Sequence, residues 1–222
     1  MDWPALTLSL ELALATMLVL LPLGICAGRV LAWSRFPGKA VVEALLALPL
    51  VLPPTVLGFY LLAAMGSASP LGRWYESIFG HPLAFSFQGL LVASIIFNLP
   101  FAIQPMQRAF EGISPDVREA ARCCGMSTPR MLQRIELPLA WPGIASALVL
   151  TFAHTLGEFG VVLMVGGSIP GETRTIAIAI YDRVQSFDSA AAGLMSAVLL
   201  LISLSAIGLS YATTNRTRRR HG

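Results

Sequence analysis

One apolar segment of the chain contains four side chains with hydroxyl, imidazole or carboxyl groups that could take part in chemistry. Thr151, His154, Thr155 and Glu158 are spaced so that they share one face of a helix. Ionisable groups are costly inside a bilayer and face a bundle interior or a partner, so this stripe is predicted to point away from lipid. His154 and Glu158 lie one turn apart, where they could share a proton or form an ion pair.

The carboxylate of Glu158 limits what this stripe could bind. A bare carboxylate repels an anion. If the chain carries an anion, Glu158 is therefore predicted to act in packing, at a gate or at a subunit interface. A direct contact with the substrate is the alternative interpretation.

A run of prolines is the second feature of interest. Pro49, Pro53 and Pro54 lie within residues 48–58, where they remove backbone donors and force a kink or a break. A half-helix that restarts near Pro54 would point its N-terminus toward the bilayer centre, and broken helices in transporters use that positive end for anionic groups. We hypothesise that Pro53, Pro54 and Thr55 border an anion path. A kink that serves packing alone is the alternative.

The other reactive side chains do not suggest a catalytic or metal site. Cys123 and Cys124 are adjacent, which is not a zinc-ligand spacing, and no disulfide is expected between these residues and Cys26. The histidines His81 and His221 are isolated. The sequence has no glycine-rich Walker loop, so ATP hydrolysis by this chain is not expected. We therefore predict no catalytic residue, no metal ligand and no cofactor bound by this chain.

The composition indicates an all-α integral membrane protein. Of the 222 residues, 55% are hydrophobic and 12% are charged, which is about half the charge of an ordinary soluble domain. The net charge of +3 is too small to indicate nucleic-acid binding. Long apolar runs predict five transmembrane helices, at about residues 5–27, 41–65, 86–106, 142–165 and 190–213.

The distribution of Lys and Arg predicts the orientation in the membrane. Twelve of the 15 basic residues lie in the connections 28–40 and 107–141 and in the tail 214–222, and three lie on the opposite side. Basic residues accumulate on the cytoplasmic side of membrane proteins. The N-terminus is therefore predicted outside, and the C-terminus with its basic tail in the cytoplasm.

The polar connection 107–141 is predicted to hold two short helices. The dipeptide 114–115 supplies an N-cap serine and a first-turn proline, and Gly125 is placed to end the first helix. A second helix is expected to start at residues 127–128 and to stop at Pro138.

One face of the first short helix is apolar but small. It carries Val117, Ala120, Ala121 and Cys124, and the two alanines allow another backbone or a bulky side chain to approach closely. A helix of this length is marginal alone and must be held by something it packs against. A cytoplasmic linker lying on its own membrane domain and an element that couples to a partner are both compatible with this face.

A wider pattern in this connection resembles the EAA loop of ABC-importer permeases, the segment that docks into the ATPase subunit. Its residues are Glu119, Ala120, Ala121, Gly125, Ile135, Leu137 and Pro138. Residues 157–160 and 166–175 are similar to a segment of molybdate permeases and, more loosely, of sulfate permeases. Residues 36–40 and 48–54 resemble the same family, so the likeness covers nearly the whole chain.

The resemblance implies a type I ABC permease bundle in the bacterial inner membrane, with a cytoplasmic coupling-helix loop. The implied partners are a dimer of ATPases that holds the ATP and Mg²⁺, a second permease copy, and a periplasmic or lipid-anchored oxyanion-binding protein. Movement of the helix around Glu119 would drive alternating access for molybdate or tungstate. The loop 166–189, with Arg174 and Arg183, is a candidate to receive the binding protein, and solvated loop charge is the alternative.

Two other functions remain compatible with the sequence. An importer of sulfate, thiosulfate or another oxyanion would share the same pattern. A channel or a membrane scaffold would explain five spans, but would leave the spacing from Glu119 to Pro138 as a coincidence.

Overall fold

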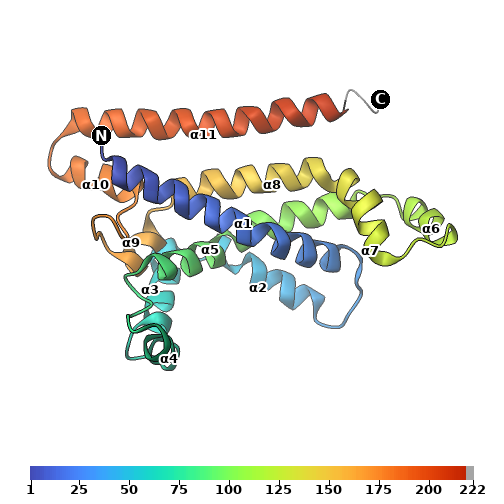
Figure 1. Cartoon of the computed structure of the whole chain (residues 1–222), viewed down its shortest axis with the longest axis horizontal. Helices are drawn as coiled ribbons and strands as arrows, with labels where there is room; N and C mark the ends of the chain where they lie inside the picture. The colour runs from blue at the N-terminus through green and yellow to red at the C-terminus, as the bar shows by residue number, and fades with distance from the viewer. Residues whose placement is uncertain (219–222) are drawn as a thin grey trace.

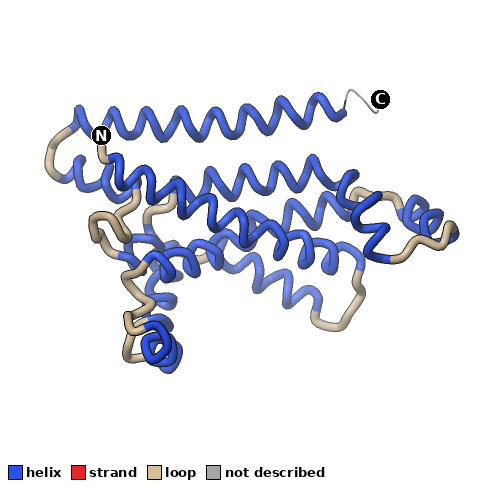
Figure 2. The backbone as a smooth tube through the Cα atoms, viewed as in Figure 1, coloured by secondary structure: helices blue, strands red, loops and turns tan. Residues whose placement is uncertain are grey.

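The computed structural model describes residues 1–218, and its regular structure over that range is entirely helical (Figure 2). Arg219, Arg220 and His221 of the predicted basic tail lie outside the described residues. The elements are α1 (Trp3–Trp33), α2 (Lys39–Val51), α3 (Pro54–Met65), α4 (Pro70–Phe79), α5 (Phe87–Glu111), α6 (Pro115–Cys123), α7 (Thr128–Met131), the π-helix η1 (Leu132–Glu136), α8 (Leu137–Gly157), α9 (Gly160–Gly166), α10 (Ile176–Gln185) and α11 (Ser189–Arg218).

The long helices run side by side along the molecule (Figure 1). α1, α5 and α8 pack against one another in pairs, α2 lies along α5, and α11 packs against α8 and α10. The short helix α6 lies at one end, which we call the α6 end (Figure 1). The N-terminus, α10 and α4 lie toward the opposite end, which we call the α10 end.

Four helices of the described chain are long and apolar enough to cross a membrane, and a bent pair would make a fifth span. The bent pair is α2 and α3, which meet at an angle of 109°. The four helices are Trp3–Trp33, Phe87–Glu111, Thr128–Gly157 and Ser189–Gly208.

The break between α2 and α3 follows from the prolines. Leu52 and Pro53 both adopt extended backbone angles, and α3 begins at Pro54. Pro54 has no N–H to continue the ladder, and its ring disfavours a helical conformation at the residue before it. The run 41–65 therefore forms two half-helices instead of one kinked helix.

The apolar run 142–165, which we expected to form one span, also holds two helices. α8 ends at Gly157, and α9 restarts at Gly160. The backbone of Glu158 is extended, and its Oε1 accepts a hydrogen bond from the N–H of Val161 at 2.8 Å. The side chain thus caps a new helix start.

Pro138 does not stop the second short helix, contrary to our expectation. The helix continues without interruption from Thr128 to Gly157, and the turn just before Pro138 is the π-helix η1. There the N–H of Leu137 bonds to the carbonyl of Leu132, five residues earlier. The wider π turn makes room for a proline that an α-helical turn would exclude.

Small residues bring α1 and α5 into close contact. A Cβ atom placed on Gly28 would lie 2.9 Å from the backbone nitrogen of Gln107. Close backbone approach at glycine is a common way to join helices in membranes, where no hydrophobic force drives helices together. Gly28 is therefore predicted to be required by packing.

The variant Gly28→Ala should lower stability by about 1–3 kcal/mol, the cost of overpacking a tight site. Gly193→Ala in α11 is the matched control, because a Cβ there meets nothing within 4 Å. The measurement is the thermal unfolding midpoint of each purified variant in detergent. Equal midpoints for the two variants would contradict the close α1–α5 contact.

Candidate functional site

The helix α6 forms where the sequence predicts the first short helix. The Oγ of Ser114 accepts the N–H of Asp116 at 3.3 Å, and Pro115 occupies the first turn. The chain leaves the helix through Gly125, whose φ of +72° favours glycine. Local sequence signals thus set both ends of this helix.

The apolar face of α6 divides between the protein and its surroundings. Ala121 is buried, whereas Val117, Ala120 and Cys124 are exposed. Glu119 is exposed as well. Most of the small face is thus free to meet another molecule.

The remaining residues of the EAA-like pattern lie at the base of α8. Ile135 is half-buried in η1, Leu137 packs on the core around Phe110 and Ile144, and Pro138 is exposed. The structure therefore divides the pattern into an exposed helix and a packed base. It does not gather the pattern into one pocket.

A buried carboxylate joins α6 to the bundle. The side chain of Glu136 has no exposed surface and lies between two guanidinium groups. Its Oε2 is 2.7 Å from Nε of Arg29 in α1, and its Oε1 is 3.2 Å from Nε of Arg118 in α6. Charge-assisted hydrogen bonds of this kind are about twice as strong as neutral ones.

An indole ring completes this cluster. The guanidinium carbon of Arg118 lies 3.5 Å from the ring centroid of Trp33, and Trp33 packs edge-on against Phe110 with centroids 5.5 Å apart. Arg118 is thus held by a carboxylate and by an aromatic face. The sequence pattern did not single out Glu136; an acid between Ile135 and Leu137 was the available signal.

A second polar cluster lies inside the bundle. The hydroxyl of Thr16 donates to Oγ of Ser94 at 2.9 Å, and the amide nitrogen of Asn98 donates to the Ser94 carbonyl at 2.8 Å. The amide oxygen of Asn98 then faces Nδ1 of His154 at 3.1 Å. This network links α1, α5 and α8, and the sequence predicted only its histidine as a site residue.

The contact with Asn98 sets the orientation of the His154 ring. The Asn98 oxygen can only accept, so Nδ1 of His154 is the donor in this contact. The ring stacks on Phe97, with centroids 4.9 Å apart, and lies tilted against Phe101, with centroids 3.8 Å apart. His154 therefore has a fixed orientation.

The predicted stripe on α8 does not act as one group. Glu158 is buried and caps α9 through Val161 instead of pairing with His154. The hydroxyl of Thr155 donates to the Thr151 carbonyl at 2.8 Å. The hydroxyl of Thr151 is buried and has no hydrogen-bond partner among the described residues.

The starts of the two half-helices α3 and α9 meet. A Cβ atom on Gly160 would lie 2.8 Å from Cβ of Pro54 and 3.7 Å from Oε1 of Glu158. Pro53 precedes α3 without a side-chain cap, and Thr55 is exposed in its first turn. The carboxylate of Glu158 thus already satisfies the positive end of α9, whereas the start of α3 carries no such anion.

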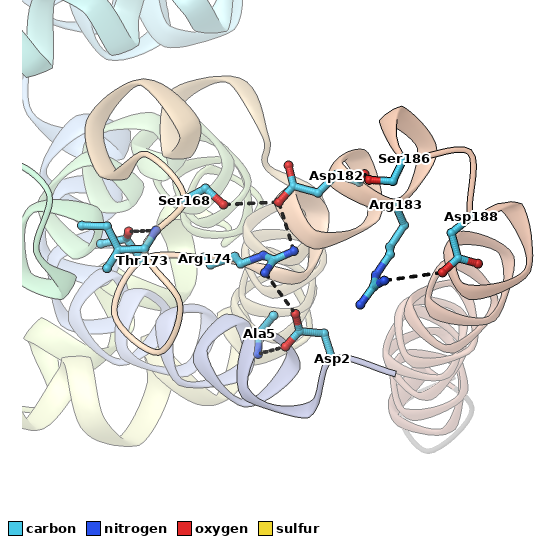
Figure 3. Close-up of polar contacts among 10 residues, drawn as sticks. Asp2, Ala5, Ser168, Thr173, Arg174, Asp182, Arg183, Ser186 and Asp188 are labelled. Atoms are coloured by element: carbon cyan, nitrogen blue, oxygen red, sulfur yellow. Dashed lines mark hydrogen bonds and ion pairs between the residues drawn. The ribbon is translucent and has the colours of Figure 1, made fainter.

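The arginines at the α10 end are paired within the chain (Figure 3). Arg174 lies 3.0 Å from a carboxylate oxygen of Asp182 and 3.7 Å from one of Asp2. Arg183 lies 3.5 Å from Asp188. Arg174 therefore ties the N-terminus to α10.

The described residues offer no site for a metal ion, since none of their His, Cys, Asp and Glu side chains form a group of three or more with suitable geometry. Cys26, Cys123 and Cys124 are exposed free thiols.

Comparison with known proteins places these features in a family. Residues 21–219 match the family described as binding-protein-dependent transport system inner membrane component. The chain is 43% identical to the molybdenum transport system permease protein of Azotobacter vinelandii, over 96% of this chain and 94% of that protein. It is 32% identical to a sulfate transport system permease protein of Synechocystis, over 94% of this chain and 77% of that protein.

A solved structure shares the fold. It is a bacterial alginate ABC transporter in complex with an alginate-bound periplasmic protein, with a TM-score of 0.77 and 18% identity, over 96% of this chain and 78% of that chain. The predicted all-helical fold and the predicted resemblance to molybdate permeases are both confirmed. The chain belongs to the family of inner-membrane components of binding-protein-dependent transport systems.

Proposed function

We propose that this chain is the membrane-spanning permease of an ATP-driven importer of molybdate. The observation that carries the proposal is the 43% identity with a molybdenum permease along nearly the full length of both chains. ATP and Mg²⁺ bind to a separate ATPase subunit, and this chain supplies the path across the membrane.

α6 is the element that receives the ATPase. Its exposed face offers small side chains, Ala120 and Cys124, beside the carboxylate of Glu119. The α6 end is then cytoplasmic, the C-terminus lies inside, and the N-terminus lies outside. This orientation agrees with the excess of Lys and Arg in the connections at that end.

The proposal extends to the partners, because the chain belongs to a family of binding-protein-dependent transport systems. Two ATPases and two copies of this chain form the core, and a periplasmic or lipid-anchored binding protein delivers the oxyanion from outside. ATP binding moves α6, and the membrane cavity alternates between its two openings. The start of α3 at Pro53, Pro54 and Thr55 borders the path, because it is the half-helix start that lacks a carboxylate cap.

His154 and the threonines of its stripe lie beside that path. The network through Asn98 fixes the ring, and the hydroxyl of Thr151 is buried without a partner. Glu158 acts as a cap that holds the broken span in shape. This role is consistent with a substrate anion that a bare carboxylate would repel.

Sulfate is the second candidate substrate, favoured by the 32% identity with a sulfate permease. Molybdate is preferred because identity with the molybdenum permease is higher and that protein is covered almost completely.

Vesicles that hold this chain, its ATPase and its binding protein should take up labelled molybdate only when ATP is present. A large excess of sulfate should leave this uptake nearly unchanged. The measurement is radiolabel accumulation, with vesicles lacking ATP as the control. Uptake without ATP would indicate a channel, and strong competition by sulfate would favour the second candidate.

Labelling of cysteines in intact cells tests the orientation. In cells that express this chain without its ATPase, and in a Cys26→Ser background, Cys123 and Cys124 should react with an impermeant thiol reagent only after the membrane is opened, since both are exposed thiols at the α6 end. Phe187→Cys, in a background without other cysteines, is the control for the outside, because Phe187 is 93% exposed between α10 and α11. Labelling of Cys123 in intact cells would place α6 on the wrong side.

Two variants of Glu158 separate capping from a need for charge. Glu158→Gln keeps an oxygen that can accept the N–H of Val161, so stability and transport should stay near wild type. Glu158→Ala removes the cap and should cost about 0.5–2 kcal/mol of stability. Thermal unfolding and uptake are measured for both. A changed substrate preference in Glu158→Gln would show instead that the carboxylate contacts the substrate.

A further inference from the structure

The helix α6 has little apolar attachment to the rest of the protein. Within residues 115–123, all of which the structure describes, Ala121 is the buried residue. Under the proposed function, a helix that carries motion from an ATPase must be firmly attached to the bundle it moves. Apolar packing of one alanine is a weak attachment, because burial energy scales with area.

Arg118 supplies an attachment of a different kind. Its side chain is only 15% exposed, so it points into the protein and not toward the face that carries Ala120 and Cys124. It is held on one side by the carboxylate of Glu136 and on the other by the ring of Trp33, 3.5 Å from the guanidinium carbon.

Glu136 connects this attachment to two long helices at once. It lies at the junction of η1 and α8, so it moves with α8. Its other oxygen accepts from Arg29, which belongs to α1. Removing one partner of a buried ion pair leaves an uncompensated charge and is strongly unfavourable. The three elements are therefore constrained to move together.

We propose that Arg29, Trp33, Arg118 and Glu136 form a joint that transmits the movement of α6 to α1 and α8. We call it the Glu136 joint. This inference rests on the proposed function, since it assumes that an ATPase moves α6. Glu136 and Arg118 are positioning residues, because they touch neither the substrate nor the nucleotide. They set how much of the movement of α6 reaches α1 and α8.

The geometry of the joint makes arginine necessary at position 118. A guanidinium plane stacks on an aromatic ring while its N–H groups bond to a carboxylate. A lysine ammonium keeps the charge, but it has no planar face to stack on the ring and no rigid set of N–H donors for the carboxylate. Arg118→Lys is therefore expected to impair the joint, although it preserves the charge of α6.

The test compares uptake with ATP consumption in vesicles that hold the complete complex. In Glu136→Gln and Arg118→Gln, ATP hydrolysis should continue, while the number of molybdate ions imported per ATP should fall by about tenfold, within the usual range of coupling between sites. Arg118→Lys should show a smaller fall. Arg108→Gln is the control, because the Arg108 side chain is 83% exposed and its ion pair is with Glu111.

The affinity of the ATPase for the permease is measured on the same variants. A joint leaves this affinity unchanged, because the exposed face of α6 is intact. An unchanged ratio of ions to ATP in both Arg118 variants would overturn the proposal, and so would a loss of ATPase binding in them. If Glu136→Gln does not fold, the two variants of the partly exposed Arg118 decide the question.

Failure of the joint and failure of the proposed function give different results. A wild-type complex that takes up no oxyanion with ATP contradicts the proposed function. If the wild type imports sulfate instead, the number of ions imported per ATP is measured with labelled sulfate, because the joint does not depend on which oxyanion is carried. If the wild-type complex imports an oxyanion with ATP and the variants import as many ions per ATP as the wild type, only the joint is contradicted.

Discussion

The constraint on which this structure depends is that a bilayer offers no water to satisfy backbone polar groups. Two apolar runs break inside the membrane region, one at Pro53 and one at Glu158. Such breaks are tolerated only where protein surrounds them. The structure meets this requirement by packing the half-helices α3 and α9 against each other, with Pro54 against Gly160.

The intact helices provide the frame for these broken ones. α1 and α5 approach closely at Gly28, and the hydrogen bonds from Thr16 through Ser94 and Asn98 to His154 link α1, α5 and α8. Polar contacts between membrane helices add specificity more than strength, since each is worth about 0.6 kcal/mol. The frame thus has a defined register, in which the ring of His154 has a fixed orientation.

Charge has two different roles in this protein. Along the sequence, basic residues are concentrated in the connections 28–40 and 107–141 and in the tail 214–222, which predicts how the chain is inserted. In the structure, individual charges join distant elements: Glu136 holds α6, α1 and α8, and Arg174 holds the N-terminus to α10. Arg174 and Arg183, which were considered as contacts for a partner, form ion pairs within the chain.

The sequence by itself determined the membrane class, the family pattern and both ends of α6, because composition, spacing and capping residues act locally. It also located the start of a half-helix near Pro54. Only the tertiary structure decided that Glu136 meets Arg29, 107 residues away, and that His154 meets Asn98, 56 residues away. It also showed that a π turn carries the helix through Pro138. Spacing along a helix tells which residues share a face, but the partner of that face depends on how separate segments pack in space.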